Sequence, residues 1–160
     1  LQLVLYKHCK MLYFCVHKNY LDKILENIKD FMMEENFDKW NQIKQKTQNM
    51  EETIFFKERD IFWAKLGKNI GFEQDGKGEE FTRPVIIIKK YTPNMVLVVP
   101  LSTTLRDGSF FFQFQFKEKI STALLVQNRM LSSKRLVKKI GKIDELNFKI
   151  LKEKLIDLIK

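Results

Sequence analysis

Two hydrophobic patterns divide the chain near residue 50. From Leu21 onward, apolar residues recur every three or four positions, which predicts an amphipathic helix. This stripe consists of Leu21, Ile24, Leu25, Ile28 and Phe31, and it continues with Phe37, Trp40 and Ile43 after a short break. A polar run at residues 44–49 dilutes the pattern, and the composition changes at Ile54. We therefore predict a helical extension with its linker over residues 1–55 and a separate domain over residues 56–160.

Short apolar runs in the second segment, separated by Gly, Pro and Asn, predict β-strands. They lie at residues 61–65, 85–88, 95–99, 109–116 and 123–126. In the fourth run, Phe110, Phe112, Phe114 and Phe116 fall on one face, and Phe111, Gln113 and Gln115 fall on the other. We interpret the aromatic face as core, although a stack for RNA bases would have the same pattern.

The helical period returns at the carboxyl end. Asp144 fits an N-cap, and Phe148, Leu151, Leu155 and Leu158 form one apolar stripe. Successive strands followed by one terminal helix favour a small, bent antiparallel barrel over alternating βαβ units. The expected fold class is mainly β with α, a small β-barrel with a C-terminal helix, preceded by a helical N-terminal extension.

The charge balance indicates a polyanionic partner. The chain has 160 residues, and 29 Lys and Arg against 20 Asp and Glu give a net charge of +9. A positive field of this size concentrates nucleic acid, although lysines that only keep a protein in solution give the same sum. The length fits one domain with a small appendage and speaks against a two-domain enzyme with a cofactor fold.

Cysteine and histidine are confined to the amino end. Cys9 and Cys15 stand beside His8 and His17, but the short CxxC spacing of zinc sites is missing, so two thiols on a helix are the favoured interpretation. Two cysteines fit a reducing cytoplasm. Charged residues at positions 7 and 10 interrupt the apolar amino end, and we expect no membrane span there.

Several catalytic motifs are absent. The sequence has no HExxH, Walker or GxSxG motif and no His after His17, which speaks against a zinc protease or a histidine-based nuclease. The run Gly76-Lys77-Gly78 imitates part of a phosphate loop without the strand and helix that such a loop needs. We interpret it as the tip of a mobile loop.

Polar blocks at strand boundaries are the remaining candidates for a site. They cover residues 71–76, 82–84 and 99–104. Arg83 directly precedes one apolar strand and Ser102 follows another, so pairing of these strands would bring a guanidinium and a hydroxyl together. The alternative is a surface arginine and an ordinary serine at a strand end.

The stretch from Glu58 to the carboxyl end resembles the MazF/PemK toxins of toxin–antitoxin modules. The resemblance rests on six blocks in the family's order. They are Asp60-Ile61-Phe62-Trp63 with Leu66-Gly67, Gly71-Phe72-Glu73-Gln74, Arg83-Pro84-Val85-Ile86-Ile87-Ile88, Val99-Pro100-Leu101-Ser102, Gln127-Asn128-Arg129, and Lys134-Arg135-Leu136-Val137-Lys138-Lys139-Ile140-Gly141.

This resemblance implies an SH3-like small β-barrel of the MazF/PemK/CcdB type in a cytoplasmic, growth-inhibiting toxin. It implies a homodimer, restrained by a cognate antitoxin, that cuts single-stranded mRNA at short preferred sequences. No metal and no cofactor are expected, because the RNA's own 2′-hydroxyl is the nucleophile, leaving cyclic-phosphate and 5′-hydroxyl ends. Relatives of this fold poison gyrase, so the alternative is a non-catalytic module that binds protein, RNA or DNA.

The family's functional positions can be placed on this chain. By resemblance, Arg83 and Ser102 are catalytic, with Arg83 clamping phosphate oxygens and Ser102 bonding to the phosphate or the leaving oxygen. The expected substrate-binding residues are Glu73, Thr103, Gln127, Arg129, Lys134 and Arg135. Glu73 belongs to a loop that closes over the substrate, where it orients a hydroxyl or pairs with Arg83.

The chain also departs from the family. Val126 stands where many members have Asp, and residues 75–81, which include Glu79 and Glu80, lengthen the first loop. A basic cluster favours polyanion binding, although a solvated face would look similar. It contains Lys134, Arg135, Lys138, Lys139 and Lys142.

Overall fold

The computed structural model describes residues 2–51 and 54–160, with side chains for residues 21–28, 30, 33–51 and 54–160. The chain forms two compact units, Leu1–Asn41 and Gln42–Lys160, each of which is described by itself. The side chains of His8, Cys9, Cys15 and His17 lie outside the described ones. None of the helices in the described part is both long and apolar enough to cross a bilayer.

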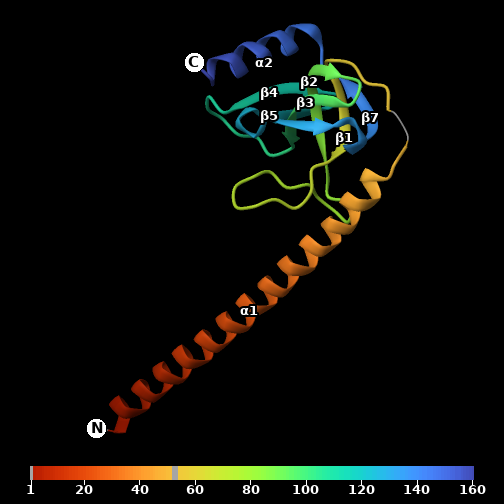
Figure 1. Cartoon of the computed structure of the whole chain (residues 1–160). Coiled ribbons are helices and arrows are strands. Elements are labelled where there is room, and N and C mark those ends of the chain that lie inside the picture. Colours follow the sequence, from red (N-terminus) through yellow and green to blue (C-terminus); the bar gives the residue numbers. More distant parts are fainter. Residues whose placement is uncertain (1, 52–53) are drawn as a thin grey trace. The chain divides into compact units, whose positions relative to one another are not determined.

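Helix α1 (Gln2–Gln48) makes up the described part of the first unit, and its residues from Gln42 onward belong to the second (Figure 1). The break in the apolar pattern before Phe37 does not interrupt it, because the intervening residues include no Gly or Pro. An ion pair one turn apart, Glu35 with Lys39 at 2.6 Å, lies on the exposed surface of this stretch.

The second unit holds seven strands and a carboxyl-terminal helix. The strands are β1 (Asp60–Lys65), β2 (Thr82–Thr92), β3 (Met95–Ser102), β4 (Phe111–Phe116), β5 (Lys119–Leu124), β6 (Arg129–Ser132) and β7 (Leu136–Lys142). Two short 3-10 helices, η1 (Leu125–Gln127) and η2 (Ser133–Arg135), precede β6 and β7, and α2 (Glu145–Asp157) ends the unit. The predicted run at 123–126 spans the end of β5 and most of η1, and the apolar pattern did not predict β6 or β7.

The strands form one antiparallel sheet in the order β4-β5-β3-β2-β1-β7. One edge of β3 serves two partners, because Met95–Val98 pairs with β6 and the last two residues pair with β5. A mainly antiparallel sheet with a terminal helix was expected and is confirmed. Within residues 54–160, no pairing joins β4 to β7, so the sheet is not closed by hydrogen bonds into the expected barrel.

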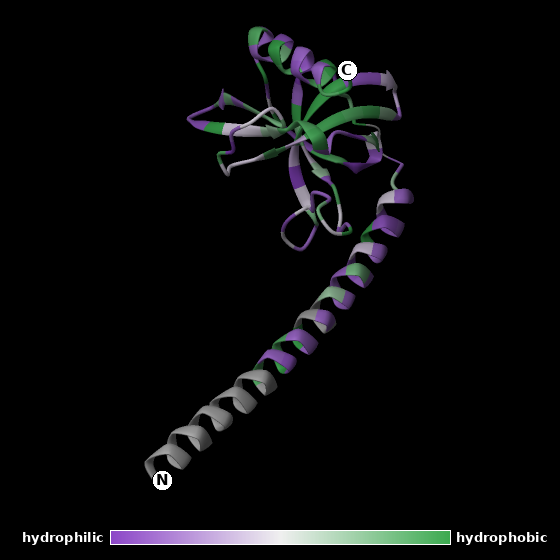
Figure 2. Cartoon of the chain, turned by 90° about the vertical axis from the view of Figure 1, so that its left-hand side faces the viewer, coloured by the Kyte–Doolittle hydropathy of each residue, from purple (hydrophilic) through white to green (hydrophobic). Residues whose placement is uncertain are grey.

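Apolar side chains cover both faces of the central strand β2, and Figure 2 shows the apolar segments concentrated in the sheet. Ile86 and Ile88 belong to one buried cluster, and Val85 and Ile87 belong to the other. A strand buried on both faces needs a continuous apolar run, which explains why four β-branched residues follow each other here.

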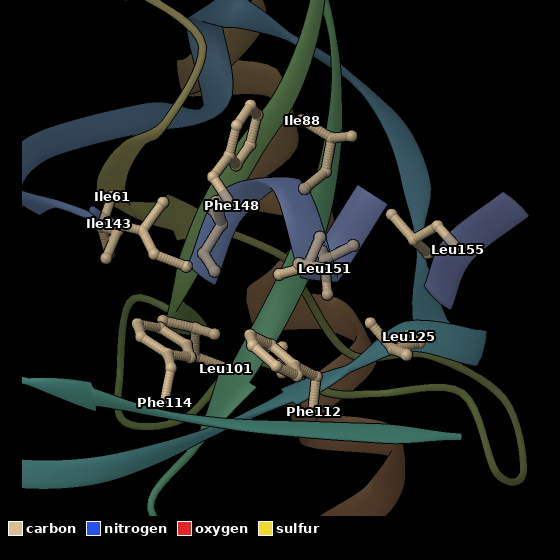
Figure 3. Packing of buried hydrophobic residues seen from close by; sticks show 13 residues of the cluster. Ile61, Ile88, Leu101, Phe112, Phe114, Leu125, Ile143, Phe148, Leu151 and Leu155 are labelled. Carbon is tan, nitrogen blue, oxygen red and sulfur yellow. The ribbon is translucent and has the colours of Figure 1, made fainter. Parts of the chain in front are cut away.

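Helix α2 covers the first of these clusters (Figures 1 and 3). The Asp144 side chain accepts a hydrogen bond from the backbone N–H of Asn147 at 2.9 Å, which confirms the predicted N-cap. Phe148, Leu151 and Leu155 are buried against the sheet, as their spacing predicted.

The aromatic strand β4 is a core strand. Phe112 and Phe114 lie in the buried cluster beneath α2, and their rings stack with centroids 6.1 Å apart (Figure 3). The interpretation of this face as core is therefore confirmed for these two residues. Phe110 differs, since it precedes the strand and is exposed.

Candidate active site

The register of β2 and β3 brings Arg83 and Ser102 together. Val85 pairs with Pro100 and Ile86 with Val99, and the same register continued by two residues sets Arg83 opposite Ser102. Both side chains line one cleft of about 650 Å³. The structure therefore places the two residues at the same end of these strands and in one cleft, as the strand pairing predicted.

The cleft has an apolar wall and a basic rim. The apolar lining consists of Trp63, Pro84, Leu101, Phe116 and Ile140. The cationic side chains of the lining are Lys77, Arg83, Lys117 and Lys119, and among the described residues that line the cleft Glu118 alone carries a carboxylate. Gly141 makes room for the Phe116 ring, because a Cβ at this glycine would lie 2.5 Å from Phe116 Cε2. The site thus combines an apolar surface with positive charge.

Two backbone carbonyls hold the Arg83 guanidinium. Its Nε donates to the carbonyl of Asp75 at 2.7 Å, and its Nη1 donates to the carbonyl of Leu101 at 3.1 Å. A guanidinium has five N–H donors, so three remain without an acceptor in the described part of the protein. A guanidinium with uncommitted donors of this kind can bind the oxygens of an anion.

The Arg83 side chain is buried, which affects its pKa. The side chain is 7% exposed, and this burial lowers the pKa of Arg83 from its ordinary value. The carboxylate of Asp75 opposes the shift in pKa, and the charge of Arg106 adds to it. Arg106 is therefore a second guanidinium close enough to influence Arg83, which sequence reasoning did not single out.

Ser102 is arranged to donate a hydrogen bond. Its Oγ accepts from the backbone N–H of Thr104 at 3.1 Å. This bond uses a lone pair of the oxygen and leaves the hydroxyl proton free to bond with a bound oxygen. Thr103 also lines the cleft and is exposed.

Asp75 organises the β1–β2 loop, residues 66–81. Its carboxylate accepts from Lys68 Nζ at 2.6 Å and from the backbone N–H of Asn69 at 2.7 Å. Asn69 in turn donates to the carbonyl of Gln74 at 2.9 Å. Asp75 lies in the polar block 71–76 that the sequence offered as part of a site, but sequence reasoning gave this residue no role of its own.

The Gly76-Lys77-Gly78 run is more ordered than its composition suggested. Lys77 and Thr82 exchange two backbone hydrogen bonds of 2.8 and 3.0 Å, and Gly76 N–H donates to the carbonyl of Gly67. A Cβ at Gly76 would lie 1.7 Å from the carbonyl oxygen of Phe81. The segment is therefore a hydrogen-bonded turn against the rest of the loop, and the predicted mobility of its tip stays a prediction.

The other predicted substrate-binding residues do not line the cleft. Glu73 is exposed, and the described contacts of Arg83 are with backbone carbonyls rather than with Glu73. Gln127 bonds to the loop backbone at Phe72 and Gln74. Arg129 donates to Asn69 Oδ1 at 3.4 Å.

The basic cluster makes contacts within the unit. Lys134 Nζ donates to the carbonyl of Gln48 at 2.6 Å, and Arg135 donates to the carbonyl of Lys65 at 3.3 Å. Burial first, and then the charge of Arg129, lowers the pKa of Arg135. Lys139 is paired with a buried carboxylate, Asp60, at 2.6 Å. Several members of the cluster therefore have structural partners.

Val126 stands at the position where the resemblance led us to expect an aspartate. Val126 is 49% exposed and does not line the cleft. Among the side chains that the structure describes, no three His, Cys, Asp or Glu residues gather as metal ligands do.

The sequence of this unit matches a family model over residues 57–159. The model describes the PemK-like, MazF-like toxins of type II toxin–antitoxin systems. The chain belongs to this family. It is thus a MazF-like toxin, as the motifs indicated. No curated protein matches the sequence.

Solved structures share the fold at low sequence identity. MazF from Deinococcus radiodurans is 16% identical with a TM-score of 0.56, covering 66% of this chain and 97% of its own. An endoribonuclease from a mycobacterial species, in complex with its cognate antitoxin, is 14% identical with a TM-score of 0.52, covering 66% and 95%. The MazE–MazF structure from Deinococcus radiodurans is 12% identical with a TM-score of 0.51, covering 66% of this chain and 96% of its own. These similarities establish the MazF-like fold.

Proposed function

We propose that this MazF-like toxin is a sequence-specific endoribonuclease that cleaves single-stranded mRNA without a metal. The observation that carries the proposal is the Arg83 guanidinium, held by two carbonyls, with three uncommitted donors beside the Ser102 hydroxyl. Fixed donors of this kind stabilise charge that develops on phosphate oxygens in a transition state.

The reaction needs only groups of the RNA and this cleft, together with water. The 2′-oxygen attacks the adjacent phosphorus, the bond from phosphorus to the 5′-oxygen breaks, and a 2′,3′-cyclic phosphate and a 5′-hydroxyl result. Arg83 would hold the non-bridging oxygens, and Ser102 would donate to one of them or to the leaving oxygen.

The 2′-hydroxyl proton needs an acceptor. Glu118 is a carboxylate of the cleft lining, and carboxylates serve as general bases in many enzymes. We assign the proton transfer to Glu118, because Glu73 does not line the cleft. Water protonates the departing 5′-oxygen as the bond breaks, so the proton that Glu118 accepts is matched by one taken from solvent.

The cleft also suits the substrate's shape and charge. Its volume of about 650 Å³ is enough for parts of a few nucleotides, and its apolar wall can contact an unstacked base. Lysines 77, 117 and 119 add positive charge along the path of a phosphate backbone.

The decisive experiment incubates a long single-stranded RNA with the wild-type protein and with Arg83→Ala in excess EDTA. Cutting by wild type alone, with cyclic-phosphate and 5′-hydroxyl ends, is the expected result. Lys149→Ala, on the exposed surface of α2, is the matched control for loss of one positive charge. Cutting only after Mg²⁺ is restored would refute the metal-independent mechanism.

A non-catalytic binding module is the outcome that would replace this proposal. Toxicity without any RNA cleavage, together with a protein or nucleic acid that co-purifies with the toxin, would establish it.

We propose two protein partners, a second copy of this chain and a cognate antitoxin. The support comes from relatives, which include an endoribonuclease with its cognate antitoxin and a MazE–MazF pair. Because mRNA is the proposed substrate, we place the activity in the cytoplasm. Light scattering of the purified toxin tests the homodimer, and co-expression with the neighbouring gene product tests the antitoxin.

A further inference from the structure

The β1–β2 loop holds an aromatic ring in open solvent. Phe72 is fully exposed, and Ile70 two positions earlier is 78% exposed. Single exposed apolar residues are ordinary on protein surfaces. Phe72 is unusual because the backbone on either side of it is fixed by hydrogen bonds, so its ring is presented from an ordered support.

Gln127 provides this support. Its Nε2 donates to the carbonyl of Phe72 at 3.0 Å, and its Oε1 accepts from the backbone N–H of Gln74 at 2.9 Å. A single amide side chain thereby pairs with the loop backbone as a neighbouring strand would. Both ends of this amide are engaged, which gives Gln127 a different task from the direct RNA contact expected of it.

The loop is also tied to the cations of the site. Asp75, three residues after Phe72, accepts from Arg83 through its carbonyl and binds Lys68 through its carboxylate. Arg129 reaches the same loop at Asn69. Phe72 therefore stands on a loop that positively charged side chains hold at three places.

We infer that the β1–β2 loop is a preorganised base-stacking platform, in which Gln127 fixes the backbone and Phe72 presents its ring to an unpaired base of the RNA. This inference rests on the proposed function and names how its substrate is gripped. Unstacked bases of single strands bind to aromatic faces, and the surrounding cations attract the phosphates between the bases. Because the loop is ordered before binding, less conformational entropy is lost when RNA arrives.

Binding of an uncleavable strand tests the platform separately from cleavage. The probe is a short, fluorescently labelled single strand in which every 2′-hydroxyl is methylated, so that attack on phosphorus is blocked. Stacking on one aromatic ring contributes about 1–3 kcal/mol, so Phe72→Ala should weaken binding about fivefold to 150-fold. Phe72→Trp should bind within about twofold of wild type. Ile70→Ala is the matched control on the same loop and should change little.

Gln127→Leu tests the support, since leucine keeps much of the volume and loses both hydrogen bonds. It should weaken binding as Phe72→Ala does, and the double variant should be no weaker than either alone, as expected for residues that act together. Hydrogen exchange at the Gln74 amide should rise in Gln127→Leu and stay unchanged in Phe72→Ala.

Strands with one abasic position locate the stacked base. For the wild-type protein, an abasic site at one position should weaken RNA binding as much as Phe72→Ala does. For Phe72→Ala, an abasic site at the same position should weaken binding no further. Equal RNA binding by Phe72→Ala and wild type, or no RNA binding by wild type, would overturn the platform. If Phe72→Ala keeps RNA binding but loses a co-expressed antitoxin, the ring is a protein-docking residue instead. RNA binding that depends on Phe72 without any cleavage would refute the nuclease and leave the platform standing.

Discussion

Arg83 donates to the carbonyl of Asp75 and forms no described bond with its carboxylate, which is engaged by Lys68 and Asn69. The loop thus orients the guanidinium without placing a carboxylate directly on it. Because no direct ion pair consumes its donors, the positive charge of Arg83 remains available to a phosphate in the cleft.

Replacement of Arg83 by lysine should preserve the charge and still abolish most of the proposed RNA cleavage. Lysine cannot reach two carbonyls and a phosphate with a planar fork of donors. We expect Arg83→Lys to cut RNA at least about a hundredfold more slowly than wild type, as for loss of a fixed transition-state donor. Single-turnover cleavage rates measure the effect, and near-normal rates would show that charge alone is sufficient.

Glu118→Gln tests the assigned proton acceptor. The amide is isosteric with the carboxylate but is a very weak base, so we expect cleavage to slow by about 10²-fold to 10⁴-fold with RNA affinity retained or improved. Glu153→Gln, on the exposed surface of α2, is the matched control and should cleave normally. Unchanged cleavage by Glu118→Gln would show that another group accepts the 2′-hydroxyl proton.

The two glycines of the turn should respond differently to alanine. At Gly76 a methyl group would collide with the Phe81 carbonyl, so Gly76→Ala should destabilise the protein by about 1–3 kcal/mol and displace the Asp75 carbonyl from Arg83. At Gly78, where φ is +68° and nothing lies within 4 Å, only backbone strain opposes alanine, and the cost should be about 1 kcal/mol. Urea unfolding with cleavage assays on both variants checks this, and equal losses would contradict it.

Asp144 should make the stability of α2 depend on pH. Its bonds to Asn147, the backbone N–H first, lower the pKa of Asp144 below its ordinary value. A carboxyl whose pKa is lower in the folded state stabilises the fold above its unfolded pKa and loses this contribution as the pH falls through its folded pKa. Asp144→Ala should therefore cost about 1 kcal/mol at pH 7 and less in acid, as measured by urea unfolding across pH. If the difference in unfolding free energy between wild type and Asp144→Ala persists in strong acid, the effect of the cap comes from packing rather than from the charge of Asp144.

Lys134 should stabilise the end of α1 more than it binds RNA. Its ammonium binds the carbonyl of Gln48 at the negative end of the helix dipole, and Lys65 bonds to Thr47 on the same turn. In Lys134→Met, amide hydrogen exchange over residues 45–49 should accelerate. RNA affinity should fall only slightly, by the amount expected when one exposed positive charge is removed. Lys138→Met is the control for loss of one positive charge. If Lys134→Met weakens RNA binding much more than this control does and leaves amide exchange unchanged, Lys134 is an RNA-binding residue.

Elements whose residue types and spacing determine the local backbone structure could be predicted from the sequence. Asp144 as a cap, the alternating phenylalanines of β4 and the strands on either side of the site were predicted because period and end signals are local. β7 was missed by periodicity because three of its seven residues are lysines and most of its side chains are partly or fully exposed. Edge strands of this kind lack the apolar pattern of a buried strand.

Residue roles were harder to predict than residue positions. Arg83 and Ser102 were expected to meet, since neighbouring strands fix their register. The partners of Gln127 lie 53 and 55 residues away in the chain, and no local pattern reveals that an amide will bond to a distant backbone. Asp75 was given no role of its own for the same reason, because its importance depends on a carbonyl that every residue has.

The bridge between Lys77 and Thr82 has an evolutionary consequence. It closes residues 78–81 into a small turn of their own, beyond the point where Gly76 and Asp75 anchor the loop to the rest of the site. Phe81 is buried and its carbonyl accepts from Leu66 and Gly67, so exchange without disturbing the support of Arg83 is open to the exposed residues Glu79 and Glu80. A lineage can therefore vary the turn, and with it what the toxin contacts, while the reactive centre is inherited unchanged.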